Sequence, residues 1–445
     1  MGKPKTVYFV LLSGITVRNL LNSGFIADLH RTTQCDITVI TSKELFDNEE
    51  AFPSLKFEFL TGRRNSVFVR AIYACIRRRG LHVYQTDSSN ILINSPLNNS
   101  LKLTLSKCLI YPFPKSKKIF RVLHWLLLLA ARKFNKTEQK FVFQSNDTVI
   151  TTSPNTIVDL PVMIAALARN STTISLIKSF DNTTSKGFFP VPTDFYFCWN
   201  EMMAREMDQI FGVKKFRCES VGVPQFDKYF TAVPNSNYLQ DTLGIHNGNP
   251  TILYATNQAE LSPDDVDIVK HISGAFPNLN FLIRVHFMDD VSRWQSESFD
   301  RNVFFQFPGA SISLDSDLRL TDPKFLDDLS ATILSCELVL NTCSTITLDA
   351  MCCGVDVGLL SIDLKGRPFA KSVERYYHLA HYKQILDLEL FPVIGSIDEL
   401  TSFLSKFSVD NSERQLLIKD ASKTLLSRHK TSLDLFSQAL LRIHG

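Results

Sequence analysis

The chain has 445 residues, of which 44% are hydrophobic and 21% are charged. This composition is typical of a folded protein of two or three domains and excludes an intrinsically disordered chain. The formal net charge of +3 is too small to indicate nucleic acid as a partner. The nine cysteines form no CxxC pair and lack a histidine at zinc-like spacing, which indicates buried thiols in a reducing cytoplasm.

Short apolar runs alternate with helix-length segments along the chain. The predicted strands are 7–13, 36–41, 55–60, 82–87, 148–153, 174–180, 195–199, 251–256, 280–286, 303–307, 338–342 and 355–363. Many of them are continuous apolar runs, as buried parallel strands are. Helix-length stretches such as 66–80 and 262–276 lie between them. The alternation predicts a doubly wound α/β architecture.

The alternation breaks in the segment 223–249, which is rich in Pro, Asn and Gly, and a new strand follows it. We therefore expect two Rossmann-like domains, 1–222 and 250–445, joined by this linker and facing each other across a cleft. The final segment, 432–445, has the pattern of a helix that could cross back onto the first domain.

The loop after the first predicted strand is a candidate anion site. Gly14 follows the strand, and Arg18 and Asn19 open the helix behind it. The GxGxxG fingerprint of dinucleotide binding is absent. The alternative is an ordinary strand–helix turn.

The segment 179–190, SFDNTTSKGFFP, lies between two predicted strands near the domain boundary. Asp181, at a strand tip, could act as general base on an acceptor hydroxyl. Asn182 could contact the acceptor, and Lys186 could hold a phosphate or a carboxylate. The alternative is an Asx turn, in which the Asp or the Asn only caps the backbone.

The segment 101–140 is strongly basic, with ten Lys and Arg and a single acidic residue. Around Trp125 it predicts a helix that lies on an anionic membrane surface with its apolar face down. The apolar run 122–131 is too short to span a bilayer, which needs about 20 residues. The alternative is a buried helix with a solvated basic flank.

Two basic side chains lie at the carboxyl end of the predicted strand 280–286. Strand alternation puts Arg284 and His286 on one face at its carboxyl end, where parallel sheets bind ligands. An Arg and a His together suit a diphosphate or a leaving group that gains negative charge. The alternative is an ion pair of Arg284 with Asp289 or Asp290 and a structural His.

The segment 338–363 carries the clearest candidate motif, a strand followed by a short helix. Free backbone N–H groups at the helix start, with the hydroxyls of Ser344, Thr345 and Thr347, are suited to a phosphate or pyrophosphate. Asp349, one turn further on, could reach a ribose hydroxyl. The same spacing fits a capped helix that binds nothing.

Taken in order, the motifs of the chain resemble bacterial surface-polysaccharide glycosyltransferases of the GT-B fold. The segments that carry this resemblance are GITVRNLLNSG, SFDNTTSKG, FYFCWNEMMAREM, VGVPQFDKY, RVHFMDD, NTCSTITLDAMCCG and ERYYHLAHY. The chain is also similar, more distantly, to CDP-glycerol glycerophosphotransferases and to UDP-N-acetylglucosamine 2-epimerases. Phe180 stands where a Trp commonly precedes the Asp, and RVHFMDD lacks the His-Pro of the polyol-phosphate enzymes.

This resemblance implies transfer of a sugar from a nucleotide sugar to a surface-glycan or lipid-linked acceptor. The C-terminal domain would hold the nucleotide diphosphate, with the three hydroxyls of the 338–363 motif at the phosphates and Asp349 near the ribose. Arg284 and His286 would stabilise the departing diphosphate, and Asp181 would be the base. The alternatives are a polyol-phosphate transferase, a nucleotide-sugar epimerase, and a non-catalytic nucleotide-binding protein of the same fold.

No metal ion and no cofactor are expected, because a helix dipole and cations can neutralise the leaving diphosphate. The nucleotide sugar is a substrate. The expected location is cytoplasmic and peripheral, at the inner face of the membrane.

Overall fold

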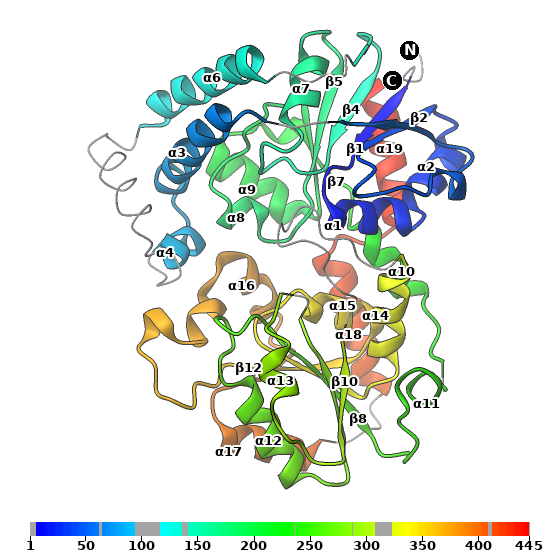
Figure 1. Cartoon of the computed structure of the whole chain (residues 1–445), viewed down its shortest axis with the longest axis vertical. Helices are drawn as coiled ribbons and strands as arrows, with labels where there is room; N and C mark the ends of the chain where they lie inside the picture. Colours follow the sequence, from blue (N-terminus) through cyan, green and yellow to red (C-terminus); the bar gives the residue numbers. More distant parts are fainter. Residues whose placement is uncertain are drawn as a thin grey trace. The chain divides into compact units, whose positions relative to one another are not determined.

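The computed structural model describes residues 6–61, 65–93, 116–135, 141–235, 237–286, 288–307, 323–407 and 412–444. These residues form two compact units (Figure 1). Unit 1 contains the described residues up to Pro224 and those from His429 onward, and unit 2 contains those from Gln225 to Arg428.

Unit 1 is built on a parallel sheet with the strand order β3-β2-β1-β4-β5-β6-β7. The strands are β1 (Val7–Val10), β2 (Ile37–Thr41), β3 (Lys56–Phe59), β4 (Thr148–Thr151), β5 (Thr172–Leu176), β6 (Phe195–Cys198) and β7 (Cys218–Ser220). The chain runs outward from β1 to β3 and then returns to β4. The topological switch point of this sheet therefore lies between β1 and β4.

Helices cover both faces of the unit 1 sheet. They are α1 (Gly14–Thr16), the π-helical η1 (Val17–Asn22), α2 (Phe25–Thr33), α3 (Val67–Val83), α4 (Asp87–Ile93), α6 (Lys117–Phe134), α7 (Leu160–Leu167), α8 (Asn182–Ser185), α9 (Glu201–Phe211) and α19 (Ser432–His444), with the 3-10 turns η2 (Glu49–Ala51) and η4 (Lys215–Arg217). Phe9 of β1 packs with Phe436 of α19 in one core, and Val10 faces a second core formed with α3, α6 and α7. Successive side chains of β1 therefore point to opposite faces of the sheet and pack into two separate apolar cores.

Unit 2 repeats this plan with a parallel sheet of order β10-β9-β8-β11-β12-β13. Its strands are β8 (Thr251–Ala255), β9 (Asn280–Arg284), β10 (Val303–Gln306), β11 (Leu338–Asn341), β12 (Asp356–Leu360) and β13 (Val393–Ile394). The switch point lies between β8 and β11, because the chain returns from β10 to the far side of β8.

The helices of unit 2 are α11 (Tyr238–Leu243), α12 (Asp265–Ala275), α13 (Ser292–Gln295), α14 (Phe325–Leu334), α15 (Ile346–Cys353), α16 (Ala380–Leu386), α17 (Ile397–Lys406) and α18 (Ser412–Leu425), with the 3-10 turns η6 (Phe369–Lys371) and η7 (Glu374–His378). The segment 223–249 carries α11, the turn η5 (Pro224–Phe226) and α10 (Asp227–Thr231), and its Tyr229 and Tyr238 are buried. The last helix, α19, belongs to unit 1.

The observed elements follow the predicted order with three differences. The predicted strand 82–87 is wrong, because α3 continues to Val83 and the Tyr84 N–H donates to the Gly80 carbonyl at 2.8 Å, as in a helix. Strands β7 and β13 were missed because they are very short edge strands with no long apolar run. None of the helices in the described part of the chain is long and apolar enough to cross a membrane.

Candidate functional site

The loops that follow β8 and β11 meet at the switch point of unit 2. Asn257, after β8, donates from its side-chain amide to the Thr342 carbonyl, after β11, at 3.4 Å. Ligands of doubly wound sheets bind at such a junction, beyond the carboxyl ends of the strands. The first candidate site therefore lies where these two loops adjoin.

A positive φ marks the loop after β11. Cys343 has φ of 39°, which is uncommon for a residue with a side chain, and its N–H donates to the Tyr377 hydroxyl at 3.3 Å. The Asn341 side-chain oxygen accepts from the Ser344 N–H at 3.1 Å. These contacts hold the backbone where the loop turns into α15.

The predicted hydroxyl residues of α15 divide into two groups. Ser344 is half-buried and Thr345 is exposed at the helix N-terminus, where the side chain of Thr345 makes no capping hydrogen bond. Thr347 is fully buried, and its hydroxyl contacts the Asn341 amide oxygen at 3.2 Å and the Tyr382 hydroxyl at 2.9 Å. Ser344 and Thr345 are thus accessible to an anion. Thr347 instead stabilises the loop through its buried contacts with Asn341 and Tyr382.

Arg284, the last residue of β9, is a buried cation. Its guanidinium donates to the Gln306 side chain at 2.5 Å and lies 5.1 Å from the centre of the Phe325 ring. Burial lowers the pKa of Arg284 to about 10, so that the group is still charged at neutral pH. Within the described residues, no carboxylate lies at ion-pairing distance from it, and Asp328 and Asp349 act on it only at longer range.

Arg284 belongs to a row of three residues across the sheet. Ala255 of β8 is in register with Arg284 of β9 on one side and with Asn341 of β11 on the other. Registered side chains of neighbouring parallel strands lie on one face, so the small Ala255 separates two hydrogen-bond donors. The Asn341 side-chain nitrogen is buried and has no hydrogen-bond partner among the described residues.

The other two predicted donor-site residues are placed differently. Asp349 is buried on α15, and its charge acts on Arg284 only at longer range. His286 lies beyond the end of β9, where its ring Nδ1 accepts from the Met288 N–H at 3.2 Å. In the neutral ring this contact places the proton on Nε2.

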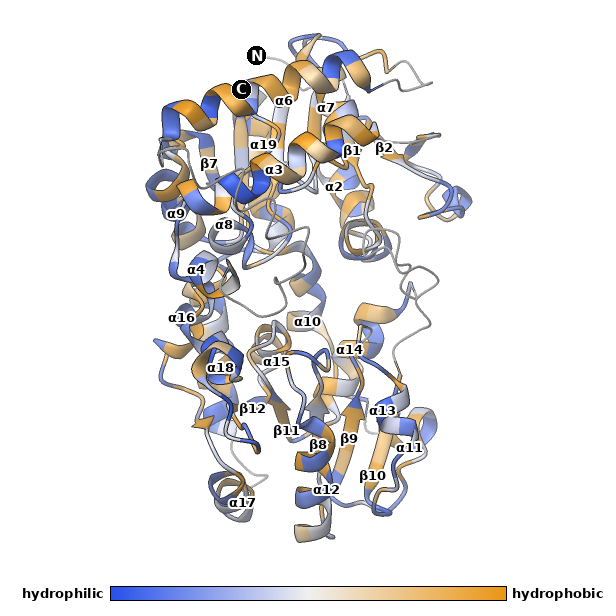
Figure 2. Ribbon diagram, turned by 60° about the vertical axis from the view of Figure 1, so that its left-hand side comes forward, coloured by the Kyte–Doolittle hydropathy of each residue, from blue (hydrophilic) through white to orange (hydrophobic). Residues whose placement is uncertain are grey.

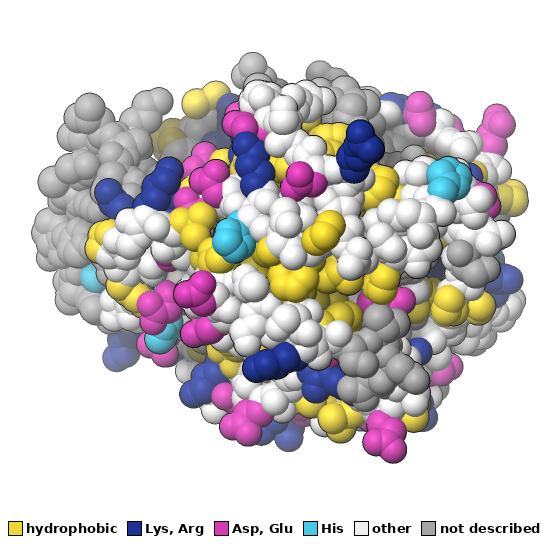
Figure 3. All heavy atoms as spheres, turned by 90° about the horizontal axis from the view of Figure 1, so that it is seen from below, with side chains coloured by type: hydrophobic (Ala, Val, Ile, Leu, Met, Phe, Trp, Pro, Cys, Tyr) yellow, Lys and Arg dark blue, Asp and Glu magenta, His cyan; other side chains and the backbone are white. Residues whose placement is uncertain are grey.

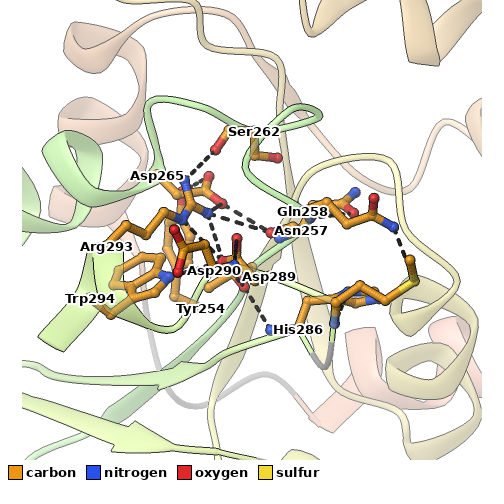
Figure 4. Close-up of polar contacts among 12 residues, drawn as sticks. Tyr254, Asn257, Gln258, Ser262, Asp265, His286, Asp289, Asp290, Arg293 and Trp294 are labelled. Atoms are coloured by element: carbon orange, nitrogen blue, oxygen red, sulfur yellow. Dashed lines mark hydrogen bonds and ion pairs between the residues drawn. The ribbon is translucent and has the colours of Figure 1, made fainter. Parts of the chain in front are cut away.

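A buried cluster of charges lies under the loops after β8 and β9 (Figure 4). Arg293 of α13 contacts the carboxylate of Asp289 at 2.8 Å and that of Asp265 at 3.4 Å. It also donates to the backbone carbonyls of Ser262 at 3.0 Å and Asn257 at 3.4 Å. Arg293 therefore ties both loops to one guanidinium, and the alternative pairing of Arg284 with Asp289 is wrong.

Asp265 is the most perturbed acid of this cluster. Its carboxylate is buried and accepts from the Tyr254 hydroxyl at 2.8 Å. Burial raises the pKa of Asp265 to about 7, although Arg293 acts in the opposite direction. The sequence analysis did not predict this cluster. Its one signal in the sequence is the pair Asp289–Asp290, which Arg293 and Trp294 follow closely.

Unit 1 has a comparable junction after β1. Gly14 begins α1, and the Arg18 guanidinium donates to the Asn19 side-chain oxygen at 2.7 Å, so the structure brings these two predicted residues together. The hydroxyl of Ser13 is fully buried and has no hydrogen-bond partner in the described part of the chain. Buried unpaired polar atoms are uncommon, and they mark positions where a ligand or a water completes the hydrogen bonding.

Asp181 precedes α8 in the loop after β5. Its carboxylate accepts from the hydroxyls of Ser179 at 2.7 Å and Ser185 at 2.6 Å and from the Asn182 amide at 3.1 Å. The Lys186 ammonium lies 2.7 Å from it. The structure therefore brings three predicted residues, Asp181, Asn182 and Lys186, into one locally bonded loop.

This loop is anchored against α3 by a glycine. Gly187 has φ of 89°, and a Cβ there would lie 2.9 Å from the Leu81 backbone nitrogen. Only a residue without a side chain allows both that conformation and that approach. Gly187 thus fixes the distance between the Asp181 loop and the end of α3.

The chain is similar to known proteins in part of its sequence and in its fold. Residues 124–321 match the model of a family described as CDP-Glycerol:Poly(glycerophosphate) glycerophosphotransferase. This match covers less than half of the chain, and a search of curated proteins finds no match. The chain is therefore similar to that family over its middle part.

Several solved structures share the architecture. A glycosyltransferase from Rickettsia africae ESF-5 has a TM-score of 0.52 and 11% identity, with 100% of this chain and 98% of that chain covered. A putative UDP-N-acetylglucosamine 2-epimerase from Listeria monocytogenes has a TM-score of 0.52 and 10% identity, with 100% and 95% covered. S. aureus MnaA, solved with UDP, has a TM-score of 0.50 and 10% identity, with 99% and 95% covered.

At such low identities the likeness shows the fold. The protein has two Rossmann-like α/β domains, and the predicted resemblance to proteins of the GT-B fold is confirmed at that level.

Proposed function

We propose that the protein is a glycosyltransferase that moves a sugar from a nucleotide sugar to a surface-glycan or lipid-linked acceptor. Unit 2 would bind the nucleotide diphosphate of the donor, and unit 1 would bind the acceptor. The fold and the similarity of residues 124–321 to a transferase family support this class of reaction. The proposed location is the cytoplasm, since the described cysteines are all free thiols.

The observation that carries the proposal is the buried Arg284. An uncompensated charge in a protein interior costs several kcal/mol. The Asn341 nitrogen, across Ala255, is a second donor without an acceptor among the described residues. Arg284 and Asn341 are thus two hydrogen-bond donors at the carboxyl ends of β9 and β11, beside the switch point, and Arg284 has no paired acid among the described residues. This arrangement favours an anionic ligand such as a diphosphate.

Each remaining candidate would have a separate role. Ser344 and Thr345, with the N-terminus of α15, would contact the phosphates, because backbone N–H groups and the helix dipole favour negative charge there. His286 would donate from Nε2 to the departing oxygen. Asp181 would accept the proton of the acceptor hydroxyl. In this proposal the cations and the helix dipole neutralise the leaving group without a metal ion.

The family match favours a second candidate, transfer of a polyol phosphate from a CDP-activated donor. The two reactions break different bonds. Sugar transfer breaks the bond between the sugar and the diphosphate and releases a nucleoside diphosphate. Polyol-phosphate transfer breaks a bond inside the diphosphate and releases a nucleoside monophosphate. An epimerase would convert the donor with no acceptor present, and a binding protein would release neither product.

A thermal-shift screen of the full chain against UDP, CDP, GDP, dTDP and CMP, with and without Mg²⁺, tests the donor site. We expect one nucleotide to stabilise the protein, by about 2.7 kcal/mol at a hundredfold excess over its Kd. The shift should disappear in Arg284→Met and in the double variant Ser344→Ala/Thr345→Ala. Arg442→Met, an exposed arginine of unit 1, is the matched control and should retain it.

The unliganded melting temperature of Arg284→Met supplies a further check. Removing an uncompensated buried charge should leave this temperature unchanged or raise it. Absence of a shift with every nucleotide would remove the transferase and epimerase proposals together. Once a donor is known, the nucleotide product decides between the two transfer reactions.

A further inference from the structure

Helix α6 turns an apolar face to solvent. Four of its apolar residues are between 38% and 56% exposed: Val122, Trp125, Leu126 and Leu129. With 3.6 residues per turn, these four positions lie on one side of the helix. The opposite side carries the buried Phe120, Leu127 and Ala131, which pack into the core of unit 1. On an ordinary surface helix, the residues outside the buried stripe are polar and face water.

Further exposed apolar side chains lie where the beginning of α3 meets the end of α6. Val67 and Phe68 are 62% and 54% exposed, and the Phe68 ring lies 4.9 Å from the ring of Phe134 at the end of α6. Figure 2 shows α3 and α6 side by side, with apolar residues along both helices. We call this surface the α3–α6 face, which consists of Val67, Phe68, Val122, Trp125, Leu126, Leu129 and Phe134.

The charges of the two helices are all of one sign. Helices α3 and α6 contain no Asp and no Glu. Their cations are Arg70, Arg77, Arg78, Arg79, Lys117, Lys118, Arg121, Arg132 and Lys133. The whole chain has 48 basic and 45 acidic residues, so composition does not explain this segregation. By contrast, the face seen in Figure 3 carries acidic and basic side chains intermingled.

The exposed cations flank the apolar centre of α6. Lys118 and Arg121 are exposed near the start of the helix, and Arg132 and Lys133 are exposed at its end. An apolar strip between two groups of cations matches the layers of an anionic membrane surface, where acyl chains lie below phosphate groups. A protein partner for this face would need an apolar surface with acidic groups at both ends.

We infer that the α3–α6 face docks onto an anionic lipid bilayer, with α6 lying in the plane of the headgroups. The apolar side chains would enter the boundary of the acyl chains, and the cations would contact lipid phosphates. This inference does not depend on the proposed transfer reaction, because it concerns a separate surface of unit 1. Of the basic segment 101–140, α6 (Lys117–Phe134) carries this surface, and residues 101–115 and 136–140 lie outside the described residues.

Tryptophan fluorescence offers a direct test with the full-length protein. The chain has three Trp, and Trp199 and Trp294 are only 4% and 1% exposed, so that a change in environment reports on Trp125. Vesicles of phosphatidylglycerol and phosphatidylcholine should shift its emission to the blue, and a brominated lipid should quench it. Vesicles of phosphatidylcholine alone should do neither, and high salt should reverse the binding.

Cosedimentation of variants with the same vesicles identifies the surface. Val122→Glu/Leu129→Glu should lower the vesicle affinity at least tenfold, because two charges would enter the apolar layer. Phe216→Glu is the matched control, since Phe216 is a 71% exposed aromatic of unit 1 outside the face. Arg121→Gln/Arg132→Gln should weaken binding about fivefold for each cation removed.

Three results would overturn the inference. The first is equal affinity for anionic and neutral vesicles. The second is vesicle binding that survives Val122→Glu/Leu129→Glu or leaves the Trp125 emission unchanged. The third is a wild-type protein that ignores vesicles and forms a dimer that the same double variant dissociates, which would assign the face to a second copy of the chain.

Discussion

The two sheets have the same strand topology, but the loops at the carboxyl ends of their strands are stabilised in different ways. In unit 2, the Arg293 side chain is 15% exposed and its partner Asp289 is 0% exposed, and the guanidinium reaches loops after two different strands. In unit 1, Lys186 and Asp181 are 37% and 23% exposed and belong to one short loop. Unit 2 is thus held by buried contacts between distant segments, and the Asp181 loop is held by its own neighbours.

This difference indicates different tasks for the two units. Buried ion pairs fix the loops of unit 2 before a ligand arrives, as a site for a small charged group requires. A locally bonded carboxylate with some exposure can exchange its partners for an acceptor at little cost. The proposed donor site in unit 2 would use the first arrangement, and the proposed acceptor site in unit 1 would use the second.

The largest expected effect belongs to the proposed base. Asp181→Asn should lower the transfer rate by a factor on the order of 10²–10⁴, because the amide cannot accept the acceptor proton. Nucleotide binding, measured by thermal shift, should be unchanged, since the proposed nucleotide site lies in the other unit. Asp208→Asn, at an exposed position of α9, is the control for activity. A variant at Asp181 with full turnover would show that its carboxylate only organises the turn.

The stability comparison comes next. Arg293→Met leaves Asp289 and Asp265 buried without their cation and should destabilise unit 2 by about 3–5 kcal/mol. Lys186→Met removes the ion-pair partner of Asp181 in unit 1 and should lower the free energy of unfolding by about 1 kcal/mol at most. Urea unfolding followed by fluorescence in a Trp125→Phe/Trp199→Phe background, where Trp294 is the remaining tryptophan, reports on unit 2, and circular dichroism reports on both units. Equal losses in the two variants would refute the distinction drawn here.

Asp265 gives unit 2 a pH dependence. Its pKa is raised to about 7 by burial, above the ordinary value of 3.8, so the native state retains a proton that the unfolded chain releases. The stabilisation is complete below about pH 4 and is lost as the pH rises through 7, with a total of up to about 4 kcal/mol. Asp265→Asn cannot titrate and should flatten this decline. Parallel curves for both proteins between pH 4 and 8 would mean that Asp265 is ionised in the native state.

The smallest effect concerns the anchoring of the Asp181 loop. Gly187→Ala and Gly212→Ala both place a side chain at a positive φ, but only the first meets neighbouring atoms within 4 Å. Both should share a strain of about 1–2 kcal/mol. Gly187→Ala should lower the free energy of unfolding by about 1–3 kcal/mol more than Gly212→Ala does, because its Cβ would overpack the contact with Leu81. Thermal unfolding of the pair measures this difference, and equal melting temperatures would show that α3 moves aside.

Sequence patterns predicted most strands because buried parallel strands need continuous apolar runs, which are visible in any window of the chain. They failed at 82–87, where β-prone residues lie in the last turn of α3 and Tyr84 packs against Phe120. They also predicted Thr347 beside Ser344 and Thr345, whereas one helical turn carries Thr347 into the core. The local sequence pattern does not predict which side of a short helix the rest of the fold will bury.

By itself, the sequence determined the α/β class, the two-domain organisation, and the positions of the loops that carry Asp181, Arg284 and Ser344. These follow from local alternation of apolar and polar residues, which neighbouring positions decide. Tertiary structure alone decided that Arg284 and Asn341 lie on either side of Ala255, and that Arg293 joins two loops. Those relations depend on the strand order β9-β8-β11, which long-range packing selects and which no single segment encodes.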